Sequence, residues 1–259
     1  EAFSPREALG DIAFIEQLGP DRPQAVDLYR KAGDTDGQAS LKVFTLYQPV
    51  PLSRRVPMLE NLGFAVNNER TYRIDPAIGG ANRIVYLHDM TIERARGGAI
   101  AIEAIDRRVE TALMALIGGR ADSDRFNQLV VEAGLDWREV VVLRAYGRYM
   151  MQTGAPFQLD YLADVLARHP AIARSLIGLF TALFDPADTA EADARRTTGA
   201  DLAGRIKASL DAVSSLDEDR IIRRFLNLIE ATTRTNHFQL GPDGAIPPAL
   251  ARFLSGSLV

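Results

Sequence analysis

Three histidines are the side chains in this sequence best suited to acid–base chemistry near neutral pH. They are His88, His169 and His237, and they lie far apart along the chain in different predicted elements. His88 is followed by Asp89 at the end of a predicted strand, so the two could form a base with its orienting carboxylate. A hydrogen-bonded structural histidine is the favoured interpretation. His169 directly precedes Pro170, which is typical of the start of a helix.

Acidic residues and arginines gather at further places that could carry chemistry. Asp217, Glu218 and Asp219 lie at the predicted start of a helix. The helix dipole stabilises negative charge there, so capping accounts for them without catalysis. Guanidinium groups suit carboxylates and phosphates, and an anionic effector is one reading of the clustered arginines. The favoured reading is that they pair with acidic residues of neighbouring helices. These are Arg144, Arg148, Arg223, Arg224 and Arg234.

The common motifs of nucleotide, metal and nucleophile chemistry are absent from the sequence. It contains no cysteine, and therefore no thiol nucleophile or cysteine-based metal site. The glycine pairs at 79–80, 97–98 and 118–119 do not form a dinucleotide-binding fingerprint, and none lies between a strand and a helix. We expect them to be hinges and helix caps. The sequence predicts no catalytic, cofactor-binding or metal-binding residue in this chain.

Composition limits the class of protein. The chain has 259 residues, of which 47% are hydrophobic and 25% charged, with a net charge of -4. These proportions are typical of a soluble globular protein of about two domains. The mild acidity argues against a dedicated nucleic-acid-binding protein. No stretch without acidic or basic residues is longer than that at 43–53, which is too short to span a membrane. Because no methionine precedes Glu1, we expect a piece of a longer protein.

The first half of the chain predicts an α+β domain. An initial helix begins at Ser4-Pro5. Strand-like segments follow at 24–30, 41–47, 64–74 and 84–92, and helices are expected at 53–62, where Ser53 would be the cap, and at 102–116. This order favours a four-stranded antiparallel sheet with both of these helices on one face.

The second half predicts a mainly α-helical array. Asp124 and Asp136 each begin a helix, and further helices are expected at 159–168, 170–184, 202–213 and from 216 onward. Residues 185–200 are polar and predict an irregular connection. Trp137 is expected to be a buried anchor of this half. The predicted domains are 1–120, 121–240 and an extended tail at 241–259.

Several short sequence motifs, in order along the chain, resemble segments of the large bacterial NAD-specific glutamate dehydrogenases. In the sheet-forming half they are Leu59-Glu60-Asn61-Leu62-Gly63-Phe64 and Glu69-Arg70-Thr71-Tyr72. In the helical half they are FNQL at 126–129, AGLDWREV at 133–140, LRAY at 143–146, VSSLDEDR at 213–220 and RTN at 234–236.

The resemblance implies a segment of an enzyme that converts L-glutamate to 2-oxoglutarate and ammonia with NAD. In that family the matching stretch lies upstream of the catalytic domain. The catalytic lysines, the glycine-rich substrate stretch and the NAD-binding domain would follow Val259. The expectation is therefore a structural or regulatory segment, inactive alone, without cofactor or catalytic residues. Its partners would be the other domains of a cytoplasmic homo-oligomer, with no nucleic acid and no membrane.

The resemblance also implies an ACT-like, ferredoxin-like sheet. Its usual last strand is missing after the second helix, so we expect residues 24–30 to supply the fourth strand from the N-terminal side. ACT modules that bind amino acids offer backbone N–H groups in the turn after their first strand. Here that turn is 48–53 and contains Pro49 and Pro51, which have no N–H. Effector binding is thereby disfavoured, and an amino-acid-sensing module is the alternative function.

Overall fold

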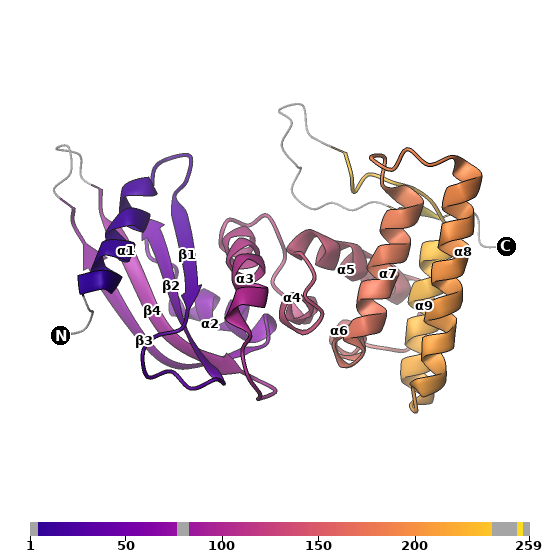
Figure 1. The fold of residues 1–259 in the computed structure, drawn as a ribbon, viewed down its shortest axis with the longest axis horizontal. Coiled ribbons are helices and arrows are strands. Elements are labelled where there is room, and N and C mark those ends of the chain that lie inside the picture. Colours follow the sequence, from indigo (N-terminus) through magenta and orange to yellow (C-terminus); the bar gives the residue numbers. More distant parts are fainter. Residues whose placement is uncertain (1–4, 77–82, 240–252, 256–259) are drawn as a thin grey trace. The chain divides into compact units, whose positions relative to one another are not determined.

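The chain folds into two compact units, residues 1–123 and residues 124–259. The computed structural model describes residues 5–76, 83–239 and 253–255 (Figure 1). We call residues 1–123 the sheet unit and residues 124–259 the helical unit. Ser4, the glycine pair at 79–80 and most of the tail at 241–259 lie outside the described residues.

Within residues 5–76 and 83–123, the sheet unit contains one antiparallel sheet and three helices. The spatial order of the strands is β1-β2-β4-β3, so the N-terminal strand lies at the edge beside β2, as predicted. The predicted α+β fold is confirmed. The elements are α1 (Pro5–Gln17), β1 (Gln24–Tyr29), β2 (Gln38–Leu46), α2 (Leu52–Asn61), β3 (Phe64–Ile74), β4 (Val85–Arg94) and α3 (Ile102–Ile117).

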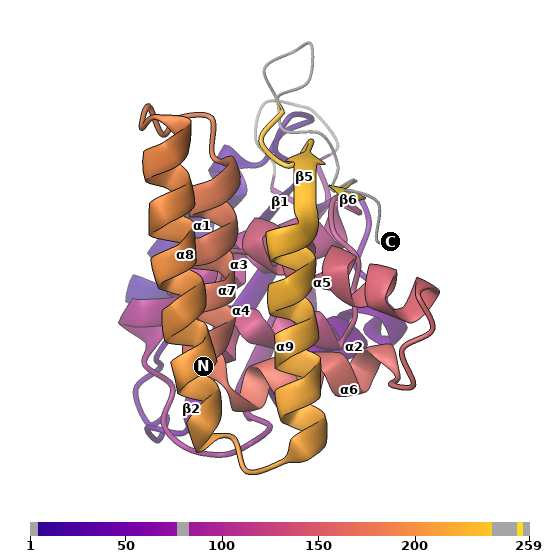
Figure 2. The same ribbon diagram turned by 90° about the vertical axis from the view of Figure 1, so that its right-hand side faces the viewer.

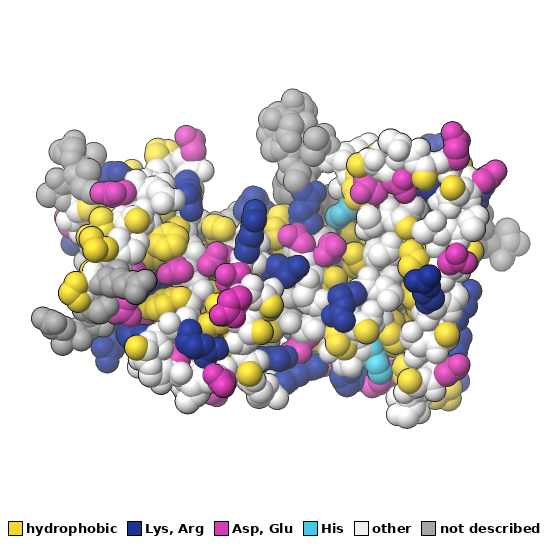
Figure 3. Space-filling model, viewed as in Figure 1, with side chains coloured by type: hydrophobic (Ala, Val, Ile, Leu, Met, Phe, Trp, Pro, Cys, Tyr) yellow, Lys and Arg dark blue, Asp and Glu magenta, His cyan; other side chains and the backbone are white. Residues whose placement is uncertain are grey.

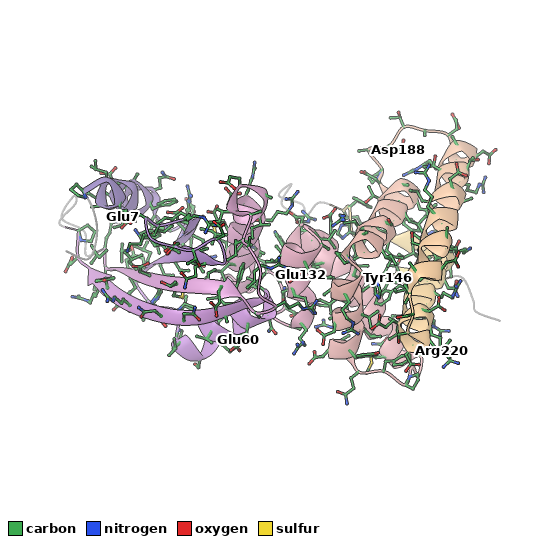
Figure 4. All side chains as sticks on the ribbon, turned by 60° about the horizontal axis from the view of Figure 1, so that its bottom comes forward. Glu7, Glu60, Glu132, Tyr146, Asp188 and Arg220 are labelled. Carbon is green, nitrogen blue, oxygen red and sulfur yellow. The ribbon has the colours of Figure 1, made fainter. Side chains whose placement is uncertain are left out.

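Helices cover both faces of this sheet. Ile15 and Leu18, at the end of α1, pack on Phe44 and Leu87 of the central strands, and the ring of Phe14 stacks on Phe44 at 5.3 Å. The two predicted helices cover the opposite face. Figure 4 shows α1, labelled at Glu7, on one side of the sheet and α2, labelled at Glu60, on the other.

The opposite face is fixed by α2 and α3. Hydrogen bonds join β1 to α3: the Gln24 side-chain amide donates to the Met114 carbonyl at 2.6 Å, and the Leu28 backbone N–H donates to the Glu110 carboxylate at 3.0 Å. Adjacent strand residues point to opposite faces, and Ala25 packs in the core with Ile15 of α1, so the Gln24 side chain and α3 lie on the opposite face. Both helices therefore share one face, as expected.

The helical unit begins with a 3₁₀ turn and ends in a short strand pair. Asp124 and Asp136 cap the elements that follow them through reciprocal hydrogen bonds, as predicted. Figure 2 shows β5 continuing directly from the end of α9. The elements are η1 (Arg125–Gln128), α4 (Leu129–Glu132), α5 (Trp137–Gln152), α6 (Leu159–Arg168), α7 (Pro170–Phe184), α8 (Ala192–Ser209), η2 (Leu210–Ala212), α9 (Leu216–Ala231), β5 (Thr232–Thr235) and β6 (Phe253–Ser255).

Three local predictions were wrong. The first helix after β2 begins at Leu52 with Pro51 as its cap residue, so Ser53 lies within the helix. The polar segment 185–200 is not irregular throughout, because α8 begins at Ala192. Trp137 is the first residue of α5 and is only partly buried, so it is not a core anchor.

A buried glycine limits the packing of α5. A Cβ added to Gly147 would lie 2.7 Å from the ring of Phe126. We expect Gly147→Ala to destabilise the helical unit by about 1–3 kcal/mol, because overpacking outweighs the gain in helix propensity. The matched control is Gly178→Ala in α7, where an added Cβ meets nothing within 4 Å. That variant should unfold at equal or higher urea concentration. Trp137, the sole tryptophan, reports unfolding by its fluorescence. Equal midpoints for the two variants would contradict this packing.

Candidate functional site

The turn between β2 and α2 is the first place to look for a ligand site. Tyr47, which follows β2, has a φ of 69°, a left-handed conformation that costs about 1–2 kcal/mol outside glycine. Its N–H donates to the Ile84 carbonyl at 2.7 Å. The turn then runs through Pro49 to Pro51, the cap residue of α2. Something in the fold must hold this turn against its backbone strain.

A closed ring of hydrogen bonds holds it, formed by Val50, His88, Thr71, Glu69 and Arg55. The Val50 N–H donates to His88 Nε2 at 3.3 Å, and His88 Nδ1 lies 2.9 Å from the Thr71 hydroxyl. That hydroxyl donates to Glu69 Oε1 at 3.1 Å. Arg55 donates to the same carboxylate oxygen and to the Val50 carbonyl, which closes the ring. We call these five residues the polar ring.

The hydrogen bonds of the polar ring fix the state of His88. Because Nε2 accepts from an amide and the Thr71 hydroxyl donates to Glu69, Nδ1 must carry the proton of a neutral imidazole. Burial, and after it the positive charge of Arg55, lower the pKa of His88 to about 4. A general base works best with a pKa near the operating pH. His88 is therefore arranged as a structural acceptor rather than as a base.

The pairing of His88 with Asp89 considered from the sequence does not form. Adjacent strand residues point to opposite faces of a sheet. His88 lies on the face of α2, where it meets Val50 in the turn before α2 and Glu69 of β3. Asp89 lies opposite Lys42 in the register of β2 and β4, on the face covered by α1.

A charged row crosses the sheet beneath α1. In register, Asp27, Lys42, Asp89 and Arg70 lie side by side on β1, β2, β4 and β3, so the sign alternates along the row. Lys42 is 2% exposed, and its ammonium group lies 2.8 Å from both carboxylate oxygens of Asp11 on α1. Burial raises the pKa values of Asp27 and Asp89, while Lys42 opposes that rise. Because a carboxylate of the chain itself binds Lys42, the row holds α1 on the sheet.

Three of the five candidate arginines of the helical unit, Arg144, Arg148 and Arg223, are bound to acidic residues. Arg144 is buried and lies 2.7 Å from Asp124, and Arg148 lies 3.6 Å from the same carboxylate. Arg223 binds Asp219 one turn earlier at 2.9 Å. Arg224 donates weakly to Thr153, and Arg234 is exposed on β5.

The acidic residues Asp217, Glu218 and Asp219 occupy the first turn of α9, as expected. Glu218 also binds two basic residues from the junction of α6 and α7. His169 Nε2 lies 2.6 Å and Arg168 Nε 2.9 Å from its two oxygens. The hydrogen bond from His169 is the largest cause of a lowered pKa of Glu218. His169 therefore joins α9 to the preceding helices.

His237 lies among aromatic rings. Its ring meets Phe180 at 5.6 Å and Phe238 at 4.9 Å, both edge-to-face. Burial lowers the pKa of His237 to about 4. The three histidines thus have three separate structural environments, and the structure does not bring them together.

Metal and membrane sites are not found among the described residues. Within 5–76, 83–239 and 253–255, no group of three acidic, histidine or cysteine side chains is arranged to hold a metal ion. None of the helices described there combines the length and the apolar character needed to cross a bilayer. On the face shown in Figure 3, basic and acidic side chains are interspersed over both units.

Sequence reasoning missed the polar ring and the buried Lys42–Asp11 pair. Members of the ring come from the turn, α2, β3 and β4, at spacings with no sequence pattern. One signal was available for Lys42. It is the only charged residue within the predicted strand 41–47, which is otherwise apolar or uncharged.

Three family models match the chain in order. The model for the ACT3 domain of glutamate dehydrogenase matches residues 23–105, and that for its helical motif 3 matches 121–186. The model for the catalytic domain of bacterial NAD-glutamate dehydrogenase matches 205–259. The first two matches therefore lie upstream of the third. The predicted domain limits at 120 and 240 stay predictions.

Three relatives named NAD-specific glutamate dehydrogenase match nearly the whole chain. The protein from Halomonas elongata is 37% identical over 100% of this chain, and that from Pseudomonas aeruginosa is 37% identical over 94%. The Mycobacterium tuberculosis protein is 38% identical over 92%. The chain spans only 16%, 15% and 14% of the lengths of these three relatives.

The polar ring predicts how acid affects the sheet unit. The pKa of His88 is about 4, below its ordinary 6.5. Between pH 6.5 and about 4, His88 is protonated in the unfolded chain but stays neutral in the folded chain. Acid therefore lowers the free energy of unfolding in this window. The loss is about 3 kcal/mol at most. Hydrogen exchange of β2 and β4 amides across these pH values should show a steeper loss for the natural chain than for His88→Gln. Equal slopes would show that His88 is not held neutral.

The Asp11–Lys42 pair predicts a cost for losing one carboxylate. Asp11→Asn leaves the buried ammonium group without its closest counter-charge, and should destabilise the sheet unit by about 3 kcal/mol. Glu16→Gln makes the same chemical change on the exposed side of α1 and should alter stability by less than about 0.5 kcal/mol. Urea unfolding followed by circular dichroism measures both. Similar losses for the two variants would contradict the role assigned to Asp11.

Proposed function

We propose that this chain, which belongs to the family of NAD-specific glutamate dehydrogenases, is a non-catalytic segment that joins an ACT-like module to the catalytic part of such an enzyme. The parent enzyme would oxidise L-glutamate to 2-oxoglutarate and ammonia and reduce NAD. The observation that carries the proposal is the order of the three family matches along one chain. Its partners would be the other domains of the same polypeptide in a cytoplasmic homo-oligomer.

The state of the polar groups supports a structural role over a catalytic one. Hydride transfer needs a cradle for the dinucleotide phosphates and a base placed at the substrate. His88 is held neutral by its ring, Lys42 is bound by Asp11, and Arg144 is bound by Asp124. NAD would therefore bind to other parts of the parent protein.

The geometry also favours a structural over an effector-sensing role for the ACT-like module. Amino-acid binding at the turn after β2 would need free backbone N–H groups. Pro49 and Pro51 lack them, the Val50 N–H is bound to His88, and the Tyr47 N–H is bound to Ile84. The chain itself therefore occupies the Tyr47 and Val50 N–H groups of this turn.

Three measurements on the 259-residue chain test the proposal. Fluorescence titration with NAD, and absorbance of NADH with glutamate and NAD, should give no signal above buffer. Thermal-shift screening with the twenty amino acids should give no stabilisation. A ligand at 100 times its dissociation constant would add about 2.7 kcal/mol.

The contradicting outcomes differ from one another. A saturable NADH signal that grows with protein concentration would make the chain an enzyme in its own right. A thermal shift with one amino acid that His88→Gln abolishes would instead support a sensor at the turn after β2.

A further inference from the structure

The boundary between the helical-motif match and the catalytic-domain match does not coincide with a boundary in the structure. The catalytic-domain model begins to match at residue 205, inside α8. The helix after it, α9, lies wholly within that match, yet it belongs to the same compact unit as α5, α6 and α7. Contacts join α9 to each of these three helices and to α8.

Burial shows how complete this packing is. The apolar face of α9 is at most 5% exposed, and Phe225 at its centre is fully buried. Without α9, the apolar side chains of α5, α6 and α7 that contact it would lose this cover. The buried residues of α9 are Ile221, Ile222, Phe225, Leu226, Leu228 and Ile229.

The start of β5 is held by a buried hydrogen bond to α5. The Thr232 hydroxyl donates its single proton to the Leu228 carbonyl at 2.7 Å, so the Tyr146 hydroxyl, 2.8 Å away, must donate to Thr232. Tyr146 is 2% exposed, and Figure 4 shows it inside the helical unit. The direction of this chain of hydrogen bonds is thus fixed, from α5 through Thr232 to α9.

The turn after β5 is held by aromatic packing on α7. Phe180 of α7 stacks on Phe238 at 5.9 Å, meets His237 edge-to-face, and meets Tyr146 at 6.2 Å. We call five of these residues the aromatic junction: Tyr146, Phe180, Thr232, His237 and Phe238. The first two lie in the helical-motif match and the other three in the catalytic-domain match.

We propose that helical motif 3 and the first part of the catalytic domain form a single folding unit, with a shared core built on α9 and the aromatic junction. This inference rests on the proposed function for the meaning of the two matches. In the parent enzyme the partner of the helical motif is then the leading helix and strand of the catalytic domain, which cannot move as a body separate from α5 and α7.

The test uses hydrogen exchange measured by mass spectrometry on the whole chain. Phe180→Ala removes the central ring of the aromatic junction and should speed exchange by about 100-fold or more. This increase is expected equally in the peptides that cover α5 and in those that cover α9 and β5. Peptides of β2 and β4 in the sheet unit should change less than twofold. The matched control, Leu216→Ala at the 63% exposed first position of α9, should leave all of these rates unchanged.

A second variant tests whether α5–α7 depend on α9. A chain ending at Gly204 lacks α9 and should lose protection throughout α5–α7 while the sheet unit keeps its own. Protection of α5–α7 within threefold of the whole chain, or faster exchange in α9–β5 alone in Phe180→Ala, would overturn the shared core. Either result is independent of NAD binding, so the proposed function can fail while this inference stands.

Discussion

A charge buried in a protein interior must be met by an opposite charge or by hydrogen bonds, because desolvation is otherwise too costly. This constraint organises both units. Lys42 and Arg55 are 2% exposed and Arg144 is 3% exposed. Each is bound to a carboxylate from another element, namely Asp11, Glu69 and Asp124. The three pairs attach α1 to the sheet, α2 to β3, and α5 to the turn before η1. Side chains that could have recognised a ligand instead hold the elements together.

Local patterns in the sequence predicted the elements well, and distant contacts decided the rest. Strand-like segments bounded by turn residues predicted the sheet, and the capping residues Asp124 and Asp136 predicted where their helices begin. The polar ring could not be read, since it joins four elements. The start of α8, before the predicted helix at 202–213, was missed because its buried residue there is Gly199, which gives no apolar periodicity. Gly199 permits a close approach to Leu183 of α7, so α8 is specified by packing rather than by pattern.

Segments defined by sequence similarity and units defined by packing need not share boundaries. The edge strand β1 precedes the first strand of the usual ACT-like order, yet it occupies the position beside β2 that closes a ferredoxin-like sheet. At the other end, α9 falls in the catalytic-domain match and completes the core of the helical unit. In both places an apolar face requires a cover, and packing decides which element supplies it, whatever the position of that element along the chain.

The central claim is that the turn after β2 is closed by the chain's own groups and is not a vacant effector site. Hydrogen exchange of the Val50 amide, followed by nuclear magnetic resonance with and without amino acids, tests it most directly. Because this N–H is bound to His88, the account predicts protection comparable to that of the central β2 amides, unchanged by any amino acid. Exchange at the rate of an open loop, or protection that arises only when an amino acid is added, would contradict the account.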